Sequence, residues 1–290
     1  MNKVTKILEA YKKSSIVSTV EADIVDKEAA ITMIIPSADR VKYTKILCGQ
    51  IQKAISNCEY EINVIFVEHN DKKHIEWVSD YGFSYVFIKR AAGEKFNKSK
   101  SFNYGAIYAK PTQYFLLHDV DIMFKKEFFT DLIENIHDSD FLFCSSHRQF
   151  INVNHAYSDL ILNGKKTIEG IHYGNGHCNP TSGKAPAGSI LVSSKTYFEV
   201  GGHDEFFTEY SFEDAIFLKK VMAVTGNINE ANEPATFLYH LEHPNHLVSR
   251  ICKAEDVLLH DTFLSLTPTE MRQVIGIKSQ SLNNLKNSIK

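Results

Sequence analysis

The sequence lacks the features that place a protein across a membrane or in an oxidising compartment. No apolar run approaches the roughly 20 residues that a membrane-spanning helix requires, and residues 1–8 lack the apolar core of a secretory signal. The five cysteines are widely spaced and form no C-x-x-C pair, which argues against a disulfide scaffold and against a structural zinc site. These absences predict a cytoplasmic protein whose membrane contact is at most peripheral, for example at the inner face of the membrane.

An excess of basic charge is also missing. The formal net charge is -3 over 290 residues, so the chain has no global positive field, and we expect no nucleic-acid partner. With 43% hydrophobic residues the chain can bury a substantial core, and its length allows one large domain or two modest ones.

Short β-rich runs alternate with amphipathic segments from about residue 30. Apolar strands are expected at residues 31–35, 62–67, 85–88, 114–117, 141–144, 189–192 and 236–240. Helices are expected around Leu47 to Ile55, Phe102 to Ala109 and Ala215 to Val224. This alternation predicts an α/β protein with a Rossmann-like, mostly parallel sheet and helices on both faces.

The segments outside this alternation have different expected roles. We expect residues 1–28 to form a helical extension that packs against the domain through Ile7, Leu8 and Tyr11, which share one helical face. Residues 152–184 are polar and predict a long functional loop or lid. Residues 266–290 predict a polar tail, either a marginal helix or partly disordered. The domain itself is expected at residues 29–265.

Three of the predicted strands end in polar residues. Pro36 and Ser37 follow the first strand, Glu68 to Asn70 follow the second, and Asp119 to Asp121 follow the fourth. In open sheets of this kind, ligands bind beyond the carboxyl ends of the strands. We therefore expect these three strand ends to converge on one crevice.

The most informative motif is the D-V-D of Asp119, Val120 and Asp121. A hard divalent cation prefers oxygen ligands and is commonly held by one or two carboxylates together with the phosphates of a substrate. A pair of acidic residues after a strand is, however, more often a solvated turn or a helix cap. The motif is specific only through the blocks around it.

Those blocks occur in a recognisable order. They are Phe96-Asn97-Lys98-Ser99-Lys100 with Asn103 and Gly105, then Asp119 to Asp121, Pro186 to Ser189, Gly201 to Phe206, and Tyr210 to Asp214. The order of these blocks, over residues from about 30 to 250, resembles that of the GT-A glycosyltransferases, most closely the β-1,4-galactosyltransferase and chondroitin-polymerase group. The resemblance implies a GT-A fold with a nucleotide half at about 29–124, and an acceptor half at about 125–265 that holds a smaller subregion.

The resemblance also implies a donor site. It places Mn²⁺ or Mg²⁺ on Asp121, with Asp119 facing the ribose, the donor sugar or metal-bound water, and a third ligand from His243 or His240. Imidazole together with carboxylate suits Mn²⁺. Glu68 is expected to accept a hydrogen bond from uracil, and Phe96 to stack on it. The full set expected around the nucleotide is Pro36, Arg40, Glu68, Phe96, Lys98, Asn103, Asp119 and Val120.

The same resemblance assigns the acceptor side. Asp214 is expected to be the general base that deprotonates the acceptor hydroxyl, with Glu213 bonded to a sugar, and Gly188 and Tyr210 next to the donor or acceptor sugar. An N-cap pair without a catalytic role is the alternative for Glu213 and Asp214. Tyr210-Ser211-Phe212 stands where the group usually has a tryptophan and two small residues, so the acceptor identity is open.

The resulting hypothesis is a metal-dependent inverting hexosyltransferase. It would move galactose, N-acetylgalactosamine or N-acetylglucosamine from a UDP-sugar to a glycan or lipid-linked glycan, in capsule or surface-polysaccharide synthesis; a homo-oligomer is left open. A retaining GT-A transferase and a catalytically inactive glycan-binding or scaffold subunit are the alternatives. A nucleotidyltransferase should have a glycine-rich first loop, and Pro36 to Arg40 contain no glycine. His172, His177 and Cys178 match no common structural zinc spacing.

Overall fold

The computed structural model describes most of the chain. The described residues are 2–14, 18–25, 27–134, 136, 141–143, 150–171, 178–180, 188–208, 211–226, 229–230, 238–243 and 252–289. No helix in these ranges is long and apolar enough to cross a membrane.

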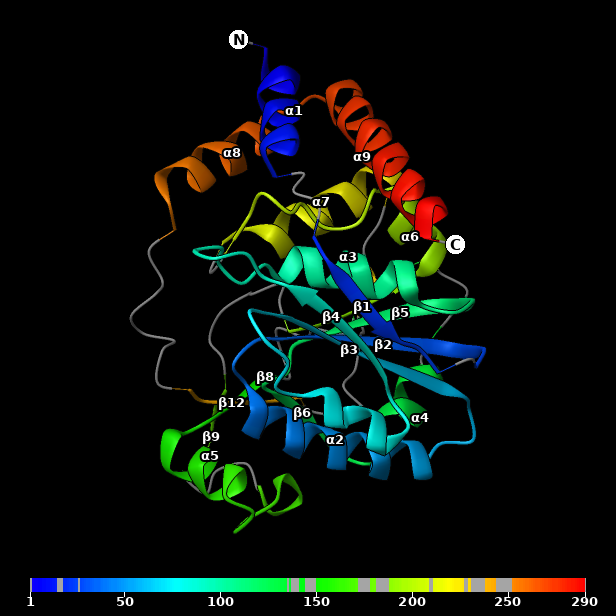
Figure 1. Cartoon of the computed structure of the whole chain (residues 1–290), viewed down its shortest axis with the longest axis vertical. Coiled ribbons are helices and arrows are strands. Elements are labelled where there is room, and N and C mark those ends of the chain that lie inside the picture. Colours follow the sequence, from blue (N-terminus) through cyan, green and yellow to red (C-terminus); the bar gives the residue numbers. More distant parts are fainter. Residues whose placement is uncertain are drawn as a thin grey trace.

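A central sheet organises the molecule (Figure 1). Its strands, in spatial order, are β1 (Val20–Asp23), β4 (Ser84–Lys89), β3 (Ile62–Asn70), β2 (Ala29–Ser37), β5 (Thr112–His118), β10 (Ser189–Ser193), β7 (Phe141–Phe143) and β11 (Asn229–Glu230). The pairs among β2, β3, β4 and β5 are parallel, whereas β1 and β10 run antiparallel to their neighbours. The predicted α/β class with a mostly parallel sheet is confirmed.

A smaller four-stranded sheet continues from the carboxyl edge of β5. Its order is β6 (Ile122–Phe124), β12 (Leu238–Leu241), β8 (Phe150–Val153) and β9 (Cys178–Pro180). In the antiparallel pair of β6 and β12, His240 lies opposite Ile122. This pairing brings a late segment of the chain beside the residues that follow β5.

Helices cover both faces of the central sheet, as Figure 1 shows. On one side lie η1 (Glu76–Tyr81), α2 (Val41–Ser56) and α4 (Phe128–Glu134), with α5 (His155–Leu162) and η2 (Ile168–Gly170) near the small sheet; on the other lie α3 (Lys98–Tyr108), α6 (Ser194–Glu199) and α7 (Glu213–Thr225). A further layer above α3, α6 and α7 consists of α1 (Lys3–Ser14), α8 (Ala254–Leu264) and α9 (Pro268–Ile289).

The buried strands explain this layering. In β2, Ile31, Met33 and Ile35 face one apolar cluster, and Ile34 faces the other. A strand with both faces buried belongs in a parallel sheet covered by helices on each side.

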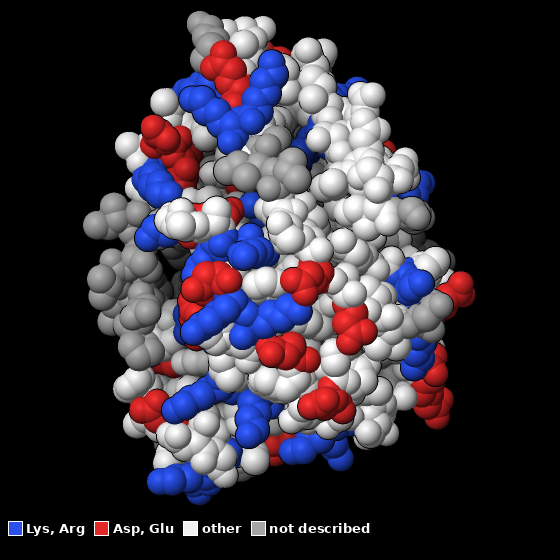
Figure 2. Space-filling view, in the orientation of Figure 1, with Lys and Arg blue, Asp and Glu red and all other residues white. Residues whose placement is uncertain are grey.

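On the molecular face in Figure 2, acidic and basic side chains are interspersed.

The structure corrects the expectation for the N-terminal extension and shows the helix, one of the two alternatives, for the C-terminal tail. The N-terminal extension is helical only to Ser14, and Val20–Asp23 forms an edge strand paired with β4. Of the three residues expected to pack, Ile7 and Tyr11 are buried and Leu8 is partly buried against the same apolar cluster, which Val4 joins. The polar tail is a 22-residue helix, α9, whose buried stripe includes Met271, Val274 and Leu282.

The predicted loop at 152–184 is also partly wrong, because it contains regular structure. Asn154 caps α5 by accepting a hydrogen bond from the backbone N–H of Tyr157, and Tyr157, Ile161 and Ile168 are buried. Capping and burial therefore order a segment whose composition reads as a loop. Residues 172–177 and 181–187 lie outside the described part of the chain.

Candidate active site

The three predicted strand ends lie at one edge of the sheet. Parallel register places Ser37 opposite Glu68, and the residues after β5 follow on the neighbouring strand. His118, fully buried, contacts Ser189 Oγ at 2.9 Å and the Ile122 carbonyl at 3.0 Å. These contacts, with a 2.8 Å bond from the Asp119 N–H to the Gly188 carbonyl, hold the turn that carries the D-V-D motif.

Asp121, His240 and His243 form a cluster whose ligand atoms all lie within 4.8 Å of one another. The Asp121 Oδ2 atom is 3.3 Å from Nε2 of His243 and 3.9 Å from Nε2 of His240. All three side chains are between 13% and 19% exposed, so solvent can reach them and they are not part of the closed core. The cluster joins two segments about 120 residues apart.

Neighbouring groups orient these ligands. Nδ1 of His240 contacts Asn152 Oδ1 at 3.1 Å, which leaves Nε2 facing Asp121. Ser158 Oγ accepts from the backbone N–H of Glu242 at 2.9 Å and donates to the Val153 carbonyl. When a metal-ligating histidine uses its other ring nitrogen for a hydrogen bond, as His240 does with Asn152, the orientation of the ring and its tautomer are fixed.

The charge state of Asp121 suits a cation. Burial alone would raise the pKa of Asp121, but the hydrogen bond from His243 and the nearby charges of His240 and Arg40 outweigh it, so the pKa lies well below its usual range. One carboxylate with two imidazoles is a donor set that fits Mn²⁺. These residues therefore fit the metal that the sequence predicts.

Lys98 links the D-V-D motif to the acidic pair of α7. Its Nζ lies 2.9 Å from Asp119 Oδ1, 2.9 Å from Asp214 Oδ2 and 3.8 Å from Glu213 Oε1. Asn97 caps α3 by accepting from the Lys100 N–H, which places Lys98 in the first turn. Glu213 and Asp214 lie in the first turn of α7, where the positive end of the helix dipole favours a carboxylate.

The three carboxyl groups around Lys98 differ in acidity. Burial raises the pKa of Asp119 to about 6, although Lys98 opposes the shift. Burial also acts on Asp214, but Lys98 and then His203 outweigh it and lower its pKa to about 2. Burial and the charge of Asp214 raise the pKa of Glu213 to about 7. Asp214 is therefore the ionised member of the pair, as a general base must be.

Five residues expected around the nucleotide lie near the carboxyl ends of β2 and β5 or next to the N-termini of α2 and α3. Lys98 is described above; Phe96 is half-buried with its ring 6.2 Å from that of His69. The Arg40 guanidinium lies 5.2 Å from the ring centre of Tyr43. Pro36 and Val120 are buried and can offer only backbone or a small apolar surface.

Glu68 and Asn103 do not have the positions expected of them. Glu68 is 1% exposed, and its carboxylate accepts hydrogen bonds from the Tyr85 hydroxyl and from the backbone N–H groups of His74 and Ile75. Asn103 is fully buried under the turn before α7. Both side chains are occupied by protein partners, so the expected contacts with the nucleotide are replaced by structural roles.

Gly188 and Tyr210, and the His172, His177 and Cys178 group, need separate mention. Gly188 is buried beside Asp119, with a φ of 104° that favours glycine. Tyr210 lies outside the described residues, as do His172 and His177, and nothing of the Cys178 side chain is described.

Several polar residues at this edge were given no role of their own by the sequence analysis. Asn70 donates to Asp39 Oδ1 at 3.1 Å and accepts from Arg90 at 3.0 Å. Asp39 has a φ of 55°, a strained value for a residue with a side chain. His203 lies against Asp214. The signal for Asn70 was available, because it ends a predicted strand; Arg90 and His203 had none.

Similar solved structures agree with this architecture. TarS of S. aureus in complex with UDP matches with a TM-score of 0.52 and 16% identity, over 84% of this chain and 69% of that chain. TarS in complex with UDP-GlcNAc matches with a TM-score of 0.51 and 16% identity, over 84% and 70%. The chain adopts the GT-A fold. At this level of identity the likeness establishes the fold alone.

A Drosophila β-1,4-galactosyltransferase 7 mutant in complex with manganese, UDP-Gal and xylobiose is more distant. It has a TM-score of 0.47 and 15% identity, over 79% of this chain and 78% of that chain. No protein-family model and no curated protein sequence matches the chain.

Proposed function

We propose that the chain is a metal-dependent inverting glycosyltransferase. It transfers a hexose or an N-acetylhexosamine from a UDP-sugar to a hydroxyl of a glycan or a lipid-linked glycan. We place it in capsule or surface-polysaccharide synthesis. Residues 29–124 form its nucleotide half and residues 125–265 its acceptor half.

One observation carries this proposal: the Asp121, His240 and His243 cluster lies at the same strand edge as the linked Asp119, Lys98 and Asp214. A cation site alone occurs in many proteins. Here the cation site lies next to a lysine and a buried ionised carboxylate. The cation and the lysine can stabilise a charged leaving group, and the carboxylate can act as a base. The complexes of TarS with UDP and UDP-GlcNAc support a UDP-sugar as the donor.

The chain's own residues account for the rest of the chemistry. A bound divalent ion would supply charge neutralisation at the diphosphate. Lys98 donates to the same diphosphate, which draws its ammonium away from Asp214 Oδ2. Asp214 then accepts the proton of the acceptor hydroxyl.

The transfer itself is a single displacement. The acceptor oxygen forms a bond to the anomeric carbon as the bond from that carbon to the UDP oxygen breaks. UDP departs with the electron pair, and the acceptor proton passes to Asp214. Attack on the face opposite UDP inverts the anomeric configuration.

Donor hydrolysis gives a test that needs no acceptor. A panel of UDP-sugars is incubated with the full chain and Mn²⁺, and released UDP is measured. We expect Mn²⁺-dependent release from one donor class, lost in Asp121→Asn and kept in Asp80→Asn, which changes an exposed aspartate in η1. The absence of any Mn²⁺-dependent UDP binding or release would reject the proposal in favour of a scaffold subunit.

A further inference from the structure

The turn between α6 and α7 contains an imidazole with no assigned role. His203 is fully buried, and its ring stacks on Phe217 at 4.1 Å with an interplanar angle of 12°. Phe102 lies on another side, with a ring separation of 5.0 Å. Nε2 of His203 is 3.4 Å from Asp214 Oδ1, the carboxylate proposed as the base.

The backbone of this turn is unusually constrained. Gly201 and Gly202 have φ values of 77° and 62°. A Cβ on Gly201 would lie 2.6 Å from the Ser279 backbone nitrogen, and one on Gly202 would lie 2.3 Å from Asn103 Oδ1. Side chains other than hydrogen are therefore excluded at both positions, and the turn is fixed against α3 and α9.

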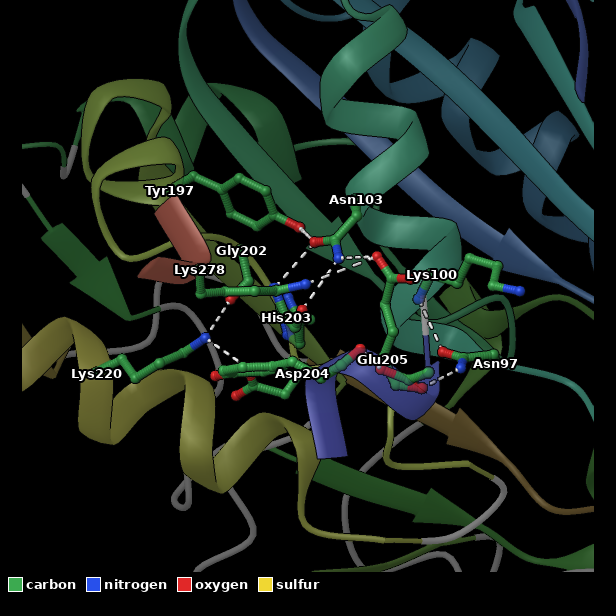
Figure 3. A network of polar contacts seen from close by, with 12 residues as sticks. Asn97, Lys100, Asn103, Tyr197, Gly202, His203, Asp204, Glu205, Lys220 and Lys278 are labelled. Carbon is green, nitrogen blue, oxygen red and sulfur yellow. Dashed lines mark hydrogen bonds and ion pairs between the residues drawn. The ribbon is translucent and has the colours of Figure 1, made fainter. Parts of the chain in front are cut away.

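Buried polar contacts hold the turn from several elements (Figure 3). Asn103 accepts from the His203 N–H at 2.9 Å and donates to the His203 carbonyl at 3.0 Å. Lys220 donates to the Gly202 carbonyl at 2.7 Å and to Asp204 Oδ1 at 3.0 Å. Tyr11 of α1 donates to the same Asp204 oxygen at 2.7 Å. Both backbone groups of His203 are thus fixed by one asparagine.

The ring environment selects a charge state and a tautomer. Burial lowers the pKa of His203, and the positive charges of Lys220 and Lys98 act in the same direction against Asp214. By hydrogen-bond geometry neither ring nitrogen has a partner among the described residues, but Nε2 lies 3.4 Å from Asp214 Oδ1. A neutral ring with its proton on Nδ1 would bury an unsatisfied donor, whereas a proton on Nε2 faces a carboxylate.

We infer that His203 is a positioning residue for the base: its neutral imidazole donates Nε2–H to Oδ1 of Asp214 and leaves Oδ2 to receive the acceptor proton. The inference rests on the proposed function. The separation of 3.4 Å is at the long limit of a hydrogen bond, and such contacts in catalytic sites commonly shorten when substrate binds. Among the residues that the structure describes, Lys98, Glu213 and, beyond Lys98, Asp119 are the other charged groups around this carboxylate.

Two substitutions separate positioning from packing. His203→Phe keeps an aromatic ring between Phe102 and Phe217 but removes the donor, whereas His203→Gln retains an N–H near the position of Nε2. We expect kcat to fall roughly tenfold to a hundredfold in His203→Phe, with the KM for the donor unchanged and the acidic limb of the kcat profile moved to higher pH. His203→Gln should recover most of both losses.

The overturning results are distinct. A wild-type kcat and pH profile in His203→Phe, or equal losses in both variants, would leave His203 with a packing role only. If His203→Phe does not fold, ¹⁵N NMR of the histidines in the wild-type chain decides the question, since it reports the tautomer directly. A neutral Nε2–H ring supports the inference, and an Nδ1–H ring or a charged ring overturns it. This readout needs no turnover, so it stands even where the proposed activity fails.

Discussion

Two regions of the molecule concentrate polar side chains, and they differ in what those side chains face. At the metal edge, the ligand atoms of Asp121, His240 and His243 lie close together and the side chains are partly exposed. In the turn at Gly201 to Glu205, Asp204 is fully buried and bonded to Lys220 of α7, which is fully buried as well. The first region resembles a site that binds from outside, and the second a scaffold that holds its neighbour in place.

The regions meet at Asp214. This carboxylate is bonded to Lys98 on the side of the metal edge and lies against His203 on the side of the turn. The difference between the regions teaches that full burial against protein partners marks support, whereas convergence with partial exposure marks chemistry. Substitutions in each region should therefore change different quantities.

The largest effect on turnover is expected at Asp214, where the two regions meet. Asp214→Asn should lower turnover by roughly 10²- to 10⁴-fold, because the amide cannot accept the acceptor proton. Calorimetry with UDP and Mn²⁺ should show unchanged binding, as the metal edge is intact. Turnover that survives this substitution would reject Asp214 as the base.

Substitutions that remove contacts of the buried turn should lower the free energy of unfolding. Lys220→Met removes one partner of an ion pair in which both side chains are 0% exposed, and this should lower the free energy of unfolding by about 3–5 kcal/mol. Lys219→Met, which changes a surface contact to the Leu264 carbonyl, is the matched control and should cost within about 0.5 kcal/mol. Denaturant unfolding measures both. Equal losses of unfolding free energy in the two variants would contradict the supporting role of the buried ion pair.

Glu213 supplies a smaller, pH-dependent effect. Because burial and Asp214 raise the pKa of Glu213 to about 7 from 4.5, the folded chain binds this proton more tightly than the unfolded chain, and stability falls as pH rises between these values. Glu213→Gln should be near neutral at pH 4.5 and stabilising by about 1–3 kcal/mol at pH 8. Urea unfolding without divalent ions gives both values, with the exposed Glu9→Gln as control. The same difference at both pH values would show that Glu213 is not protonated in the fold.

Much of the fold followed from periodic patterns. The strands near residues 31, 62, 85 and 114 are long apolar runs, and their burial on both faces leaves no other arrangement than a covered parallel sheet. The strands β6, β9 and β11 have two or three residues each and carry no pattern to detect. The stripe of Met271, Val274, Ile275 and Leu282 was a helical signal in the tail that its polar composition obscured.

The site was predicted less evenly. Asp121 was expected because it follows an apolar strand and because the resemblance assigns the metal to it, and the histidines were expected from the resemblance. Glu68 also ends a strand, but its partners are backbone N–H groups and the hydroxyl of Tyr85, which only the folded chain brings together. The contact of His203 with Asp214 depends likewise on two positive-φ glycines and on α9.

The central claim is that Asp121, His240 and His243 bind one divalent ion. Pulsed electron paramagnetic resonance of the full chain with Mn²⁺ and UDP tests it directly, because ligating imidazole nitrogens couple to the electron spin. We predict one bound Mn²⁺ with two nitrogen couplings, one of which disappears in His240→Ala and the other in His243→Ala, and weakened binding in Asp121→Asn. Binding of Mn²⁺ without nitrogen coupling, or unaffected by Asp121→Asn, would contradict the account.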